Sequence, residues 1–325
     1  MEPVLLIKLV GGMVYLLLGG DILVRGAVSL ARRFHVSPTM IALTVVALGT
    51  SLPELVVVVR AALGGFPDLV FGNVVGSNIA NVLLVAGAAA TVYPLTYGER
   101  SIRRDSAIMV AASVLLVALS LGGTLGRTEG AILLAGLVGV NLLTAREAAQ
   151  AWKDSELKAP MEWVLGLPTN PWMIALFLVA GVVGLPIGAE LVVDASVDIA
   201  SSLGVSEAVV GLTILAIGTS LPELATTVVA AFQKRTEVAI GTIVGSNIFN
   251  ILGIMGVGAV ISPVPVNVAR EFLTLHFPVM LGTAVLINVF VWRRIPVGRA
   301  AGIAFLAMYA AYLAVLVVRT VAQAG

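Results

Sequence analysis

Cysteine is absent from the sequence, and charged residues are rare. The lack of cysteine among 325 residues excludes disulfides, thiolate metal sites and iron–sulfur clusters. Charged residues make up 11% of the chain and hydrophobic residues 59%, whereas soluble globular chains contain roughly 25% charged residues. The mean hydropathy is +1.07, and apolar runs reach the roughly 20 residues that cross a bilayer. The composition therefore predicts an integral membrane protein surrounded by lipid.

Several chemical signatures are also missing. The sequence has no His-Glu-x-x-His motif, no Gly-x-Ser-x-Gly motif and no cysteine nucleophile, so we expect no enzyme activity and no cofactor. The two histidines, His35 and His276, lie outside the repeated motifs described below. The start of the chain, Met-Glu-Pro, has no basic segment, so we expect no cleaved signal peptide. The net charge of +1 gives no reason to expect nucleic acid as a partner.

One motif of seven residues occurs twice. Residues 49–55 and 218–224 both read Gly-Thr-Ser-Leu-Pro-Glu-Leu, at an offset of 169 residues. A second motif, Gly-Ser-Asn-Ile followed one residue later by Asn, recurs at the same offset in 76–81 and 245–250. Asp21 and Glu190 also share this offset. A register that holds without a gap from residue 21 to residue 81 indicates a duplicated unit rather than chance.

The hydropathy pattern predicts ten membrane-spanning helices. The expected spans are 4–24, 36–63, 69–93, 105–122, 129–147, 171–197, 206–232, 237–260, 270–291 and 299–319. A polar segment, 148–170, separates five spans from five. We therefore expect an all-α polytopic membrane protein in which residues 1–147 and 171–325 form two five-helix repeats.

Positive charge is distributed unevenly between the two sides of the membrane. The loops after the first, third, fifth, seventh and ninth spans contain 14 of the 19 basic residues. Basic loops stay in the cytoplasm, so we expect a cytoplasmic linker at 148–170 and both termini outside. Because five is an odd number, the second repeat would enter the membrane inverted, as in secondary transporters with sites near the bilayer midplane. The alternative is that duplication only enlarged a helical bundle.

Each copy of the first motif contains a glutamate within an apolar run. A carboxylate near the bilayer centre costs a few kcal/mol, and intramembrane acids usually mark ion or substrate sites. No lysine or arginine lies in the adjacent turns, and the basic residue nearest to Glu54 is Arg60. Glu54 and Glu223 are therefore candidate cation ligands, with a structural, protonated or hydrogen-bonded carboxyl as the alternative.

The proline before each glutamate predicts a break in the helix. Pro53 and Pro222 have no N–H to donate and clash with the carbonyl four residues back. Irregular backbone at membrane depth is tolerated only where it is buried or lines a cavity. Thr50 and Ser51 share a helix face with Glu54, so carboxylate, hydroxyls and loosened carbonyls lie within one turn. The second copy supplies Thr219, Ser220 and Glu223 in the same way.

The second motif adds an amide and a hydroxyl in each copy. Ser77 and Asn81 are four residues apart and share a face, as do Ser246 and Asn250. Asn78 and Asn247 fall on a different face, so we expect them to be structural. For the serine and asparagine pairs, hydrogen bonding between helices is the alternative to ion binding.

Together these residues predict a site with only oxygen ligands and two negative charges. Hard cations such as Ca²⁺ and Na⁺ prefer oxygen, and Ca²⁺ takes six to eight such ligands. Soft transition metals would prefer cysteine or histidine. Two carboxylates suit one Ca²⁺ or several monovalent ions in turn, and competition for shared carboxylates is a direct physical route to antiport.

At these residues the chain resembles the Ca²⁺/cation antiporter superfamily, and most closely prokaryotic Na⁺/Ca²⁺ exchangers. The resemblance covers both halves, with α-repeat motifs over 36–93 and 206–260. It implies Na⁺/Ca²⁺ exchange by alternating access in the inner or plasma membrane, by a monomer. It also implies a ligand set from both copies. The implied ligands are Ala47, Thr50, Ser51, Glu54, Ser77, Asn81, Ala216, Thr219, Ser220, Glu223, Ser246 and Asn250.

Departures from relatives leave other couplings open. K⁺-dependent members use an aspartate where this chain has Asn81 or Asn250, so the two asparagines argue against K⁺ cotransport. H⁺/Ca²⁺ exchangers usually have asparagine where this chain has Thr50 and Thr219, which favours Na⁺ over H⁺. A Ca²⁺ channel is a more distant alternative, because channel acids usually come from identical subunits around an axis.

Overall fold

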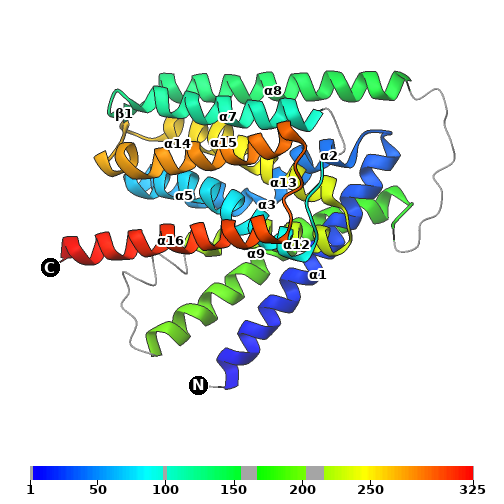
Figure 1. Ribbon diagram of the computed structural model, residues 1–325, viewed down its shortest axis with the longest axis horizontal. Helices are drawn as coiled ribbons and strands as arrows, with labels where there is room; N and C mark the ends of the chain where they lie inside the picture. Colours follow the sequence, from blue (N-terminus) through cyan, green and yellow to red (C-terminus); the bar gives the residue numbers. More distant parts are fainter. Residues whose placement is uncertain (1–2, 98–100, 155–166, 203–215, 325) are drawn as a thin grey trace.

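The computed structural model describes residues 3–97, 101–154, 167–202 and 216–324. Within these ranges the chain is mostly helical, as predicted. The only extended pairing there consists of β1 (Thr124–Leu125) with β2 (Val266–Asn267), which are antiparallel, and a single bridge between Leu95 and Val297. The protein is thus a helical bundle with two short β connections between its loops (Figure 1).

The helices follow one another with few irregular residues between them. Those of the first part are α1 (Pro3–Arg33), α2 (Pro38–Ile41), η1 (Ala42–Val46), α3 (Ala47–Thr50), α4 (Leu52–Gly64), α5 (Pro67–Ala80), η2 (Asn81–Val85), α6 (Ala86–Val92), α7 (Ser101–Ser120) and α8 (Arg127–Asp154). Those of the second part are α9 (Pro171–Ser202), α11 (Ala216–Gly218), α12 (Leu221–Phe232), α13 (Thr236–Ile248), η4 (Phe249–Met255), α14 (Gly256–Ile261), η5 (Phe272–His276), α15 (Phe277–Arg293) and α16 (Arg299–Ala324).

Seven helices in the described part of the chain are long and apolar enough to cross a membrane. The bent pair Pro38–Thr50 and Leu52–Gly64 would be an eighth span. All eight coincide with predicted spans. The remaining two predicted spans correspond to α7, whose first turns carry three charged residues, and to the short helices α11 and α12. Residues 206–215 of the latter span lie outside the described ranges, so a total of ten spans stays a prediction.

One predicted span is shorter than its helix, and another helix continues past the end of its span. The first span was expected to end at residue 24, but α1 continues to Arg33. The fifth span was expected to end at residue 147, where the candidate span ends, and α8 continues as a helix to Asp154 in the expected linker. Arginine and lysine are good helix formers, so the backbone stays helical where the side chains become charged.

α1 packs along α9, and the two helices are antiparallel (Figure 1). Small residues allow this close approach: a Cβ atom added at Gly12 would lie 3.0 Å from Gly188 O, and one at Gly188 would lie 3.2 Å from Gly12 O. Glycines at such contacts let membrane helices pack backbone against backbone. The pair has its own small apolar core, formed with α12 and η1 and separate from the main core.

The main core surrounds the helices that carry the second motif. The helix α13–η4–α14 is almost completely buried, and α5–η2–α6 is the next most buried of the long apolar helices in the described part. Both contain a π-helical segment, η2 beginning at Asn81 and η4 containing Asn250. A π-helical turn widens the helix locally and is frequent at functional sites. Both segments therefore alter the regular helix where the asparagines of the second motif occur.

Candidate functional site

The proline of the first motif breaks the helix as predicted. The helix axis bends by 47° between α3 and α4, and Ser51 forms the junction with φ −87° and ψ 9°. Pro53 follows in the first turn of α4 and has no N–H for the carbonyl of Gly49. Ser220 has almost the same backbone, with φ −88° and ψ 3°. The two copies of the motif therefore fold locally in the same way.

Ser51 and Glu223 bring the two copies of the first motif together. Ser51 Oγ donates a hydrogen bond of 2.9 Å to Glu223 Oε1, across 172 residues of sequence. The carboxylates of Glu223 and Glu54 lie close enough to interact electrostatically. Ser51, Glu54 and Glu223 are each 1% exposed or less. Two acids from distant parts of the chain are thus buried within electrostatic reach of each other.

The second motif also joins the two halves of the chain. Asn81 Nδ2 donates a hydrogen bond of 3.0 Å to Asn247 Oδ1. Asn81, Ser77, Ser246 and Asn250 are all buried. α3 packs against α12 and α13, α11 against α5, and α5 against η4, so the elements with the candidate ligands contact one another.

The two threonines and two alanines of the candidate set lie at the helix breaks. Thr50 is buried and donates to Ala47 O at 3.3 Å, and the same carbonyl accepts from Ser51 N at 3.1 Å. The carbonyl of Ala47, implied as a ligand by the resemblance, is therefore engaged within its own helix. Ala216 begins α11, and Thr219 lies half-buried in the turn before α12.

Within the described ranges, buried polar atoms without a hydrogen-bond partner are concentrated in these motifs. In the candidate set they are Oε1 and Oε2 of Glu54, Oε2 of Glu223, Oγ of Ser220 and Ser246, Oδ1 of Asn81, and Oδ1 and Nδ2 of Asn250. No ion pair of the described residues includes Glu54 or Glu223. Buried polar atoms are normally satisfied, so such a group of oxygens suits a ligand that supplies positive charge. Hard cations have this property and prefer oxygen donors.

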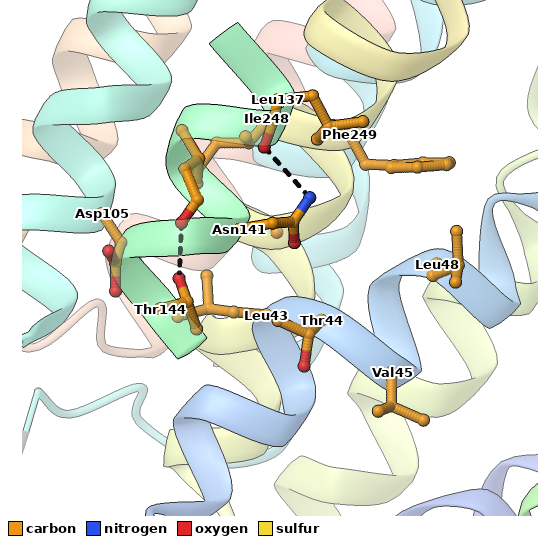
Figure 2. A pocket seen from close by; sticks show the side chains of 12 residues that line it. Leu43, Thr44, Val45, Leu48, Asp105, Leu137, Asn141, Thr144, Ile248 and Phe249 are labelled. Carbon is orange, nitrogen blue, oxygen red and sulfur yellow. Dashed lines mark hydrogen bonds between the residues drawn. The ribbon is translucent and has the colours of Figure 1, made fainter. Parts of the chain in front are cut away.

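A cavity elsewhere in the molecule has a different chemistry. It measures about 190 Å³, lies between η1, α8 and η4, and includes none of the twelve candidate residues (Figure 2). Its amide Asn141 and hydroxyl Thr144 donate to carbonyls of their own helix. Its carboxylate, Asp105, is ion-paired with Arg104 at 2.5 Å. The polar groups of this cavity are thus engaged by the protein, unlike those of the repeated motifs.

Three further polar residues belong to this region and were not among the expected ligands. Asn247, expected to be structural, contacts Asn81 directly. Thr226 and Thr227 follow Glu223 by three and four residues on α12, and their hydroxyls are buried without a partner. The spacing of three and four from the glutamate was a signal that could have identified both threonines.

Comparison with known proteins identifies the family of the chain. The family model described as sodium/calcium exchanger protein matches residues 4–144 and 173–318. The chain is 35% identical over 314 residues to the inner membrane protein YrbG of Escherichia coli (strain K12), covering 95% of each chain. It is 31% identical over 338 residues to the sodium/calcium exchanger MaX1 of Methanosarcina acetivorans, covering 94% of this chain and 96% of that one.

A solved structure extends the likeness to the fold. The structure of the sodium-calcium exchanger NCX_Mj, soaked without Na⁺ and Ca²⁺, matches with a TM-score of 0.80 and 28% identity. The match covers 97% of this chain and all of the other. This family consists of transporters, in agreement with the expectation that the protein is not an enzyme. The chain belongs to the sodium/calcium exchanger family, and it is an integral membrane cation antiporter.

Proposed function

We propose that the protein exchanges Na⁺ for Ca²⁺ at one site near the middle of the membrane. The two ions bind in turn to the same buried oxygens of Glu54 and Glu223. The single observation that carries this proposal is the bond from Ser51 to Glu223, which joins the two motif copies while three of the four carboxylate oxygens keep no partner. Two carboxylates balance the charge of one Ca²⁺ or of two Na⁺ ions, and competition for these shared ligands couples the two fluxes.

The remaining ligands complete an oxygen shell from both copies. Ser77, Asn81, Ser246 and Asn250 contribute side chains from the second motif. Ala47, Thr50, Thr219, Ser220 and Ala216 contribute hydroxyls and carbonyls from the helix breaks. Because Ala47 O already accepts two hydrogen bonds, its role requires one of them to lengthen when the ion binds.

The arrangement in the membrane follows the sequence pattern. Ten spans form two inverted five-helix repeats, 1–147 and 171–325, with the linker and most basic loops in the cytoplasm and both termini outside. The relative YrbG is named an inner membrane protein, which supports the same location for this chain. Transport requires no cofactor and no second subunit.

Alternating access would come from the α1–α9 pair. Most of their buried apolar residues belong to the small core that also includes residues of α2, η1 and α12, whereas the main core surrounds the helices of the second motif. A pair of helices that lies mostly outside the main core can slide or tilt as a unit with little change in the packing of that core. Such movement past the motif helices would expose the site first to one side of the membrane and then to the other.

Ion flux in proteoliposomes tests this proposal. Radioactive Ca²⁺ uptake is measured with an imposed gradient of Na⁺, K⁺ or H⁺ as the only driving force. Na⁺/Ca²⁺ exchange predicts uptake that saturates with Ca²⁺ and occurs only with Na⁺ inside the vesicles. Uptake driven by a proton gradient without Na⁺ would indicate an H⁺/Ca²⁺ exchanger, and Na⁺-independent uptake that does not saturate would indicate a channel. Either result would refute Na⁺ coupling.

A further inference from the structure

We propose that Asn247 is a positioning residue for cation binding, because it fixes the side-chain amide of Asn81 with its oxygen toward the ion. The inference rests on the proposed function, in which Asn81 Oδ1 is a ligand. The expected ligand set does not include Asn247, and its helix face had predicted only a structural role.

Asn247 lies at the centre of a short chain of hydrogen bonds. Its Oδ1 accepts from Asn81 Nδ2 at 3.0 Å. Its Nδ2 lies 3.4 Å from the backbone carbonyl of Asn78 and 3.4 Å from the sulfur of Met109. Asn247 is 2% exposed and belongs to α13, the most buried part of the bundle (Figure 1). These hydrogen bonds therefore connect three helical segments, α5–η2, α7 and α13. None of the residues that form them faces water.

The donors and acceptors of this chain allow only one orientation of each amide. A carbonyl oxygen and a thioether sulfur can only accept hydrogen bonds, so the Nδ2 group of Asn247 must face Asn78 O and Met109. The Oδ1 of Asn247 then faces Asn81 and can only accept. Asn81 must present its own Nδ2 group, since two amide oxygens would repel each other. The orientation of Asn81 is thus set by the backbone carbonyl of Asn78, through Asn247.

This orientation decides what Asn81 offers to a cation. With Nδ2 held by Asn247, Asn81 Oδ1 points away from that contact, is buried and has no partner. A turned amide would present N–H groups to the cation in place of lone pairs, which exchanges a ligand for a repulsive group. Residues that orient metal ligands typically change affinity by about 10- to 100-fold when replaced. Asn247 acts in this way on Asn81 and does not touch the ion.

The equivalent residue of the first copy lacks this role. Asn78, at the offset of 169 residues from Asn247, donates from its Nδ2 to Val74 O of its own helix at 2.6 Å. Asn250, the counterpart of Asn81, has no hydrogen-bond partner for either amide atom. Asn78 is as buried as Asn247, at 2% exposed. It therefore provides a matched control in which the same substitution removes a similar amide from the other half.

The test measures Ca²⁺ binding to the purified full chain in detergent and Na⁺-driven Ca²⁺ uptake in proteoliposomes. We expect Asn247→Ala to raise the Kd and the KM for Ca²⁺ by about 10-fold or more, and Asn78→Ala by no more than about twofold. Circular dichroism and size-exclusion chromatography establish that each variant is folded. If Asn247→Ala does not fold, Asn247→Ser removes the same contact, because the shorter hydroxyl cannot reach Asn81, and the same loss is expected.

A second background separates positioning from packing. In Asn81→Ala there is no side-chain amide whose orientation has to be fixed. Adding Asn247→Ala to this background should change Kd by no more than about twofold relative to Asn81→Ala alone, because the two substitutions act through one contact. A packing role would reduce affinity equally in both backgrounds.

The outcomes distinguish this inference from the proposed function. Loss of affinity for Asn247→Ala in the natural background alone supports the inference. Equal losses in both backgrounds, equal losses for Asn78→Ala, or an unchanged Kd while the natural chain binds Ca²⁺ would overturn the positioning role and leave the exchange proposal intact. A natural chain that neither binds Ca²⁺ nor takes it up with Na⁺ would overturn both.

Discussion

The two copies of the first motif have the same letters and nearly the same backbone, yet their side chains have different partners. Ser51 and Ser220 differ by only a few degrees in φ and ψ. Ser51 donates to Glu223, whereas Ser220 Oγ and both oxygens of Glu54 have no hydrogen-bond partner among the residues that the structure describes. Local sequence therefore determines the helix break, and the packing of distant helices determines which acid is held.

The same difference occurs in the second motif. Asn81 is tied to Asn247, and the symmetric contact from Asn250 to Asn78 is not formed. In both motifs a candidate ligand of one copy is held by a residue of the other, and the reverse contact is not formed. A transporter that alternates between two states needs such asymmetry, because identical environments on both sides of a site would describe only one symmetric state. The following substitutions test how far the copies differ in function.

The largest effect is expected from removing either carboxylate charge. Glu54→Gln and Glu223→Gln keep the size of the side chain, replace one acceptor oxygen with an NH2 donor and leave one negative charge at the site. At a separation of 4 Å a unit charge contributes about 4 kcal/mol for a monovalent ion at an effective dielectric of 20, so Ca²⁺ affinity should fall by about a thousandfold or more. Equilibrium dialysis with radioactive Ca²⁺ measures the Kd of each variant.

Glu190→Gln is the control for this charge removal, because Glu190 is an exposed glutamate on α9. It should bind Ca²⁺ like the natural chain. If either buried glutamate can be replaced without loss of affinity, that carboxylate is structural and the site does not use both copies equally.

Part of the candidate site could be predicted from the sequence. The repeated Pro53 and Pro222 predicted the helix breaks, since a proline cannot donate to the preceding turn wherever it occurs in a helix. The repeated acids and hydroxyls predicted a group of buried oxygens, and those oxygens are buried and largely without partners. These features depend on residues a few positions apart.

The features that escaped prediction depend on residues far apart. Asn247 was assigned to a different helix face from the ligands, and that face meets Asn81 only because α13 packs against η2. The carbonyl of Ala47 was expected to be available, but Ser51 N and Thr50 Oγ1 both reach it within the bent helix. The end of α1 at Arg33 could not be read from charge, because a charged side chain leaves the helical backbone intact.

The second prediction concerns the serines of the two copies, Ser51 and Ser220. Ser51→Ala removes a hydrogen bond to the carboxylate of Glu223, and such bonds to charged groups contribute about 1.5–3 kcal/mol. Ser220→Ala removes a hydroxyl without a partner in the same backbone. We expect Ser51→Ala to weaken Ca²⁺ binding by about 10- to 100-fold. Titration of both variants with Ca²⁺ measures the two losses of affinity. Equal losses would contradict the asymmetry between the two copies.

The third prediction concerns the glycine that begins each copy. A Cβ atom added at Gly49 would lie 2.5 Å from Val182 Cγ2 on α9, and one at Gly218 would contact Val193 of the same helix. Gly49→Ala should therefore lower the free energy of unfolding by about 1–3 kcal/mol through overpacking. Thermal unfolding measured by circular dichroism checks this. The addition of Val182→Ala should restore stability.

Gly139→Ala provides the control for overpacking, because an added Cβ at Gly139 of α8 meets no described atom within 4 Å. It should be at least as stable as the natural chain, because alanine is favoured over glycine in a helix by about 1 kcal/mol. An equal loss in Gly139→Ala, or a failure of Val182→Ala to rescue Gly49→Ala, would show that the effect does not come from contact with α9.

The smallest effect is expected at Asp21 of α1 and Glu190 of α9, which occupy equivalent positions in the two repeats. Asp21 on α1 accepts from Gln233 Nε2 at 2.7 Å and pairs with Arg25 at 2.8 Å, whereas Glu190 on α9 is exposed. The bond to Gln233 links α1 to the end of α12 and has to break if α1 slides past it. Since Asp21 is 33% exposed, solvent screening limits this link to about 1 kcal/mol.

Gln233→Leu should therefore accelerate the movement of α1 out of the conformation seen in this structure. Where this step limits turnover, we expect a rise in the maximal rate of Na⁺-driven Ca²⁺ uptake of up to about fivefold. The KM for Ca²⁺ should not change, because Gln233 contributes no oxygen to the site. Glu190→Gln should leave both parameters unchanged. A changed KM with an unchanged rate would mean that Asp21 and Gln233 act on the ion itself, and movement of α1 would then not be limited by this contact.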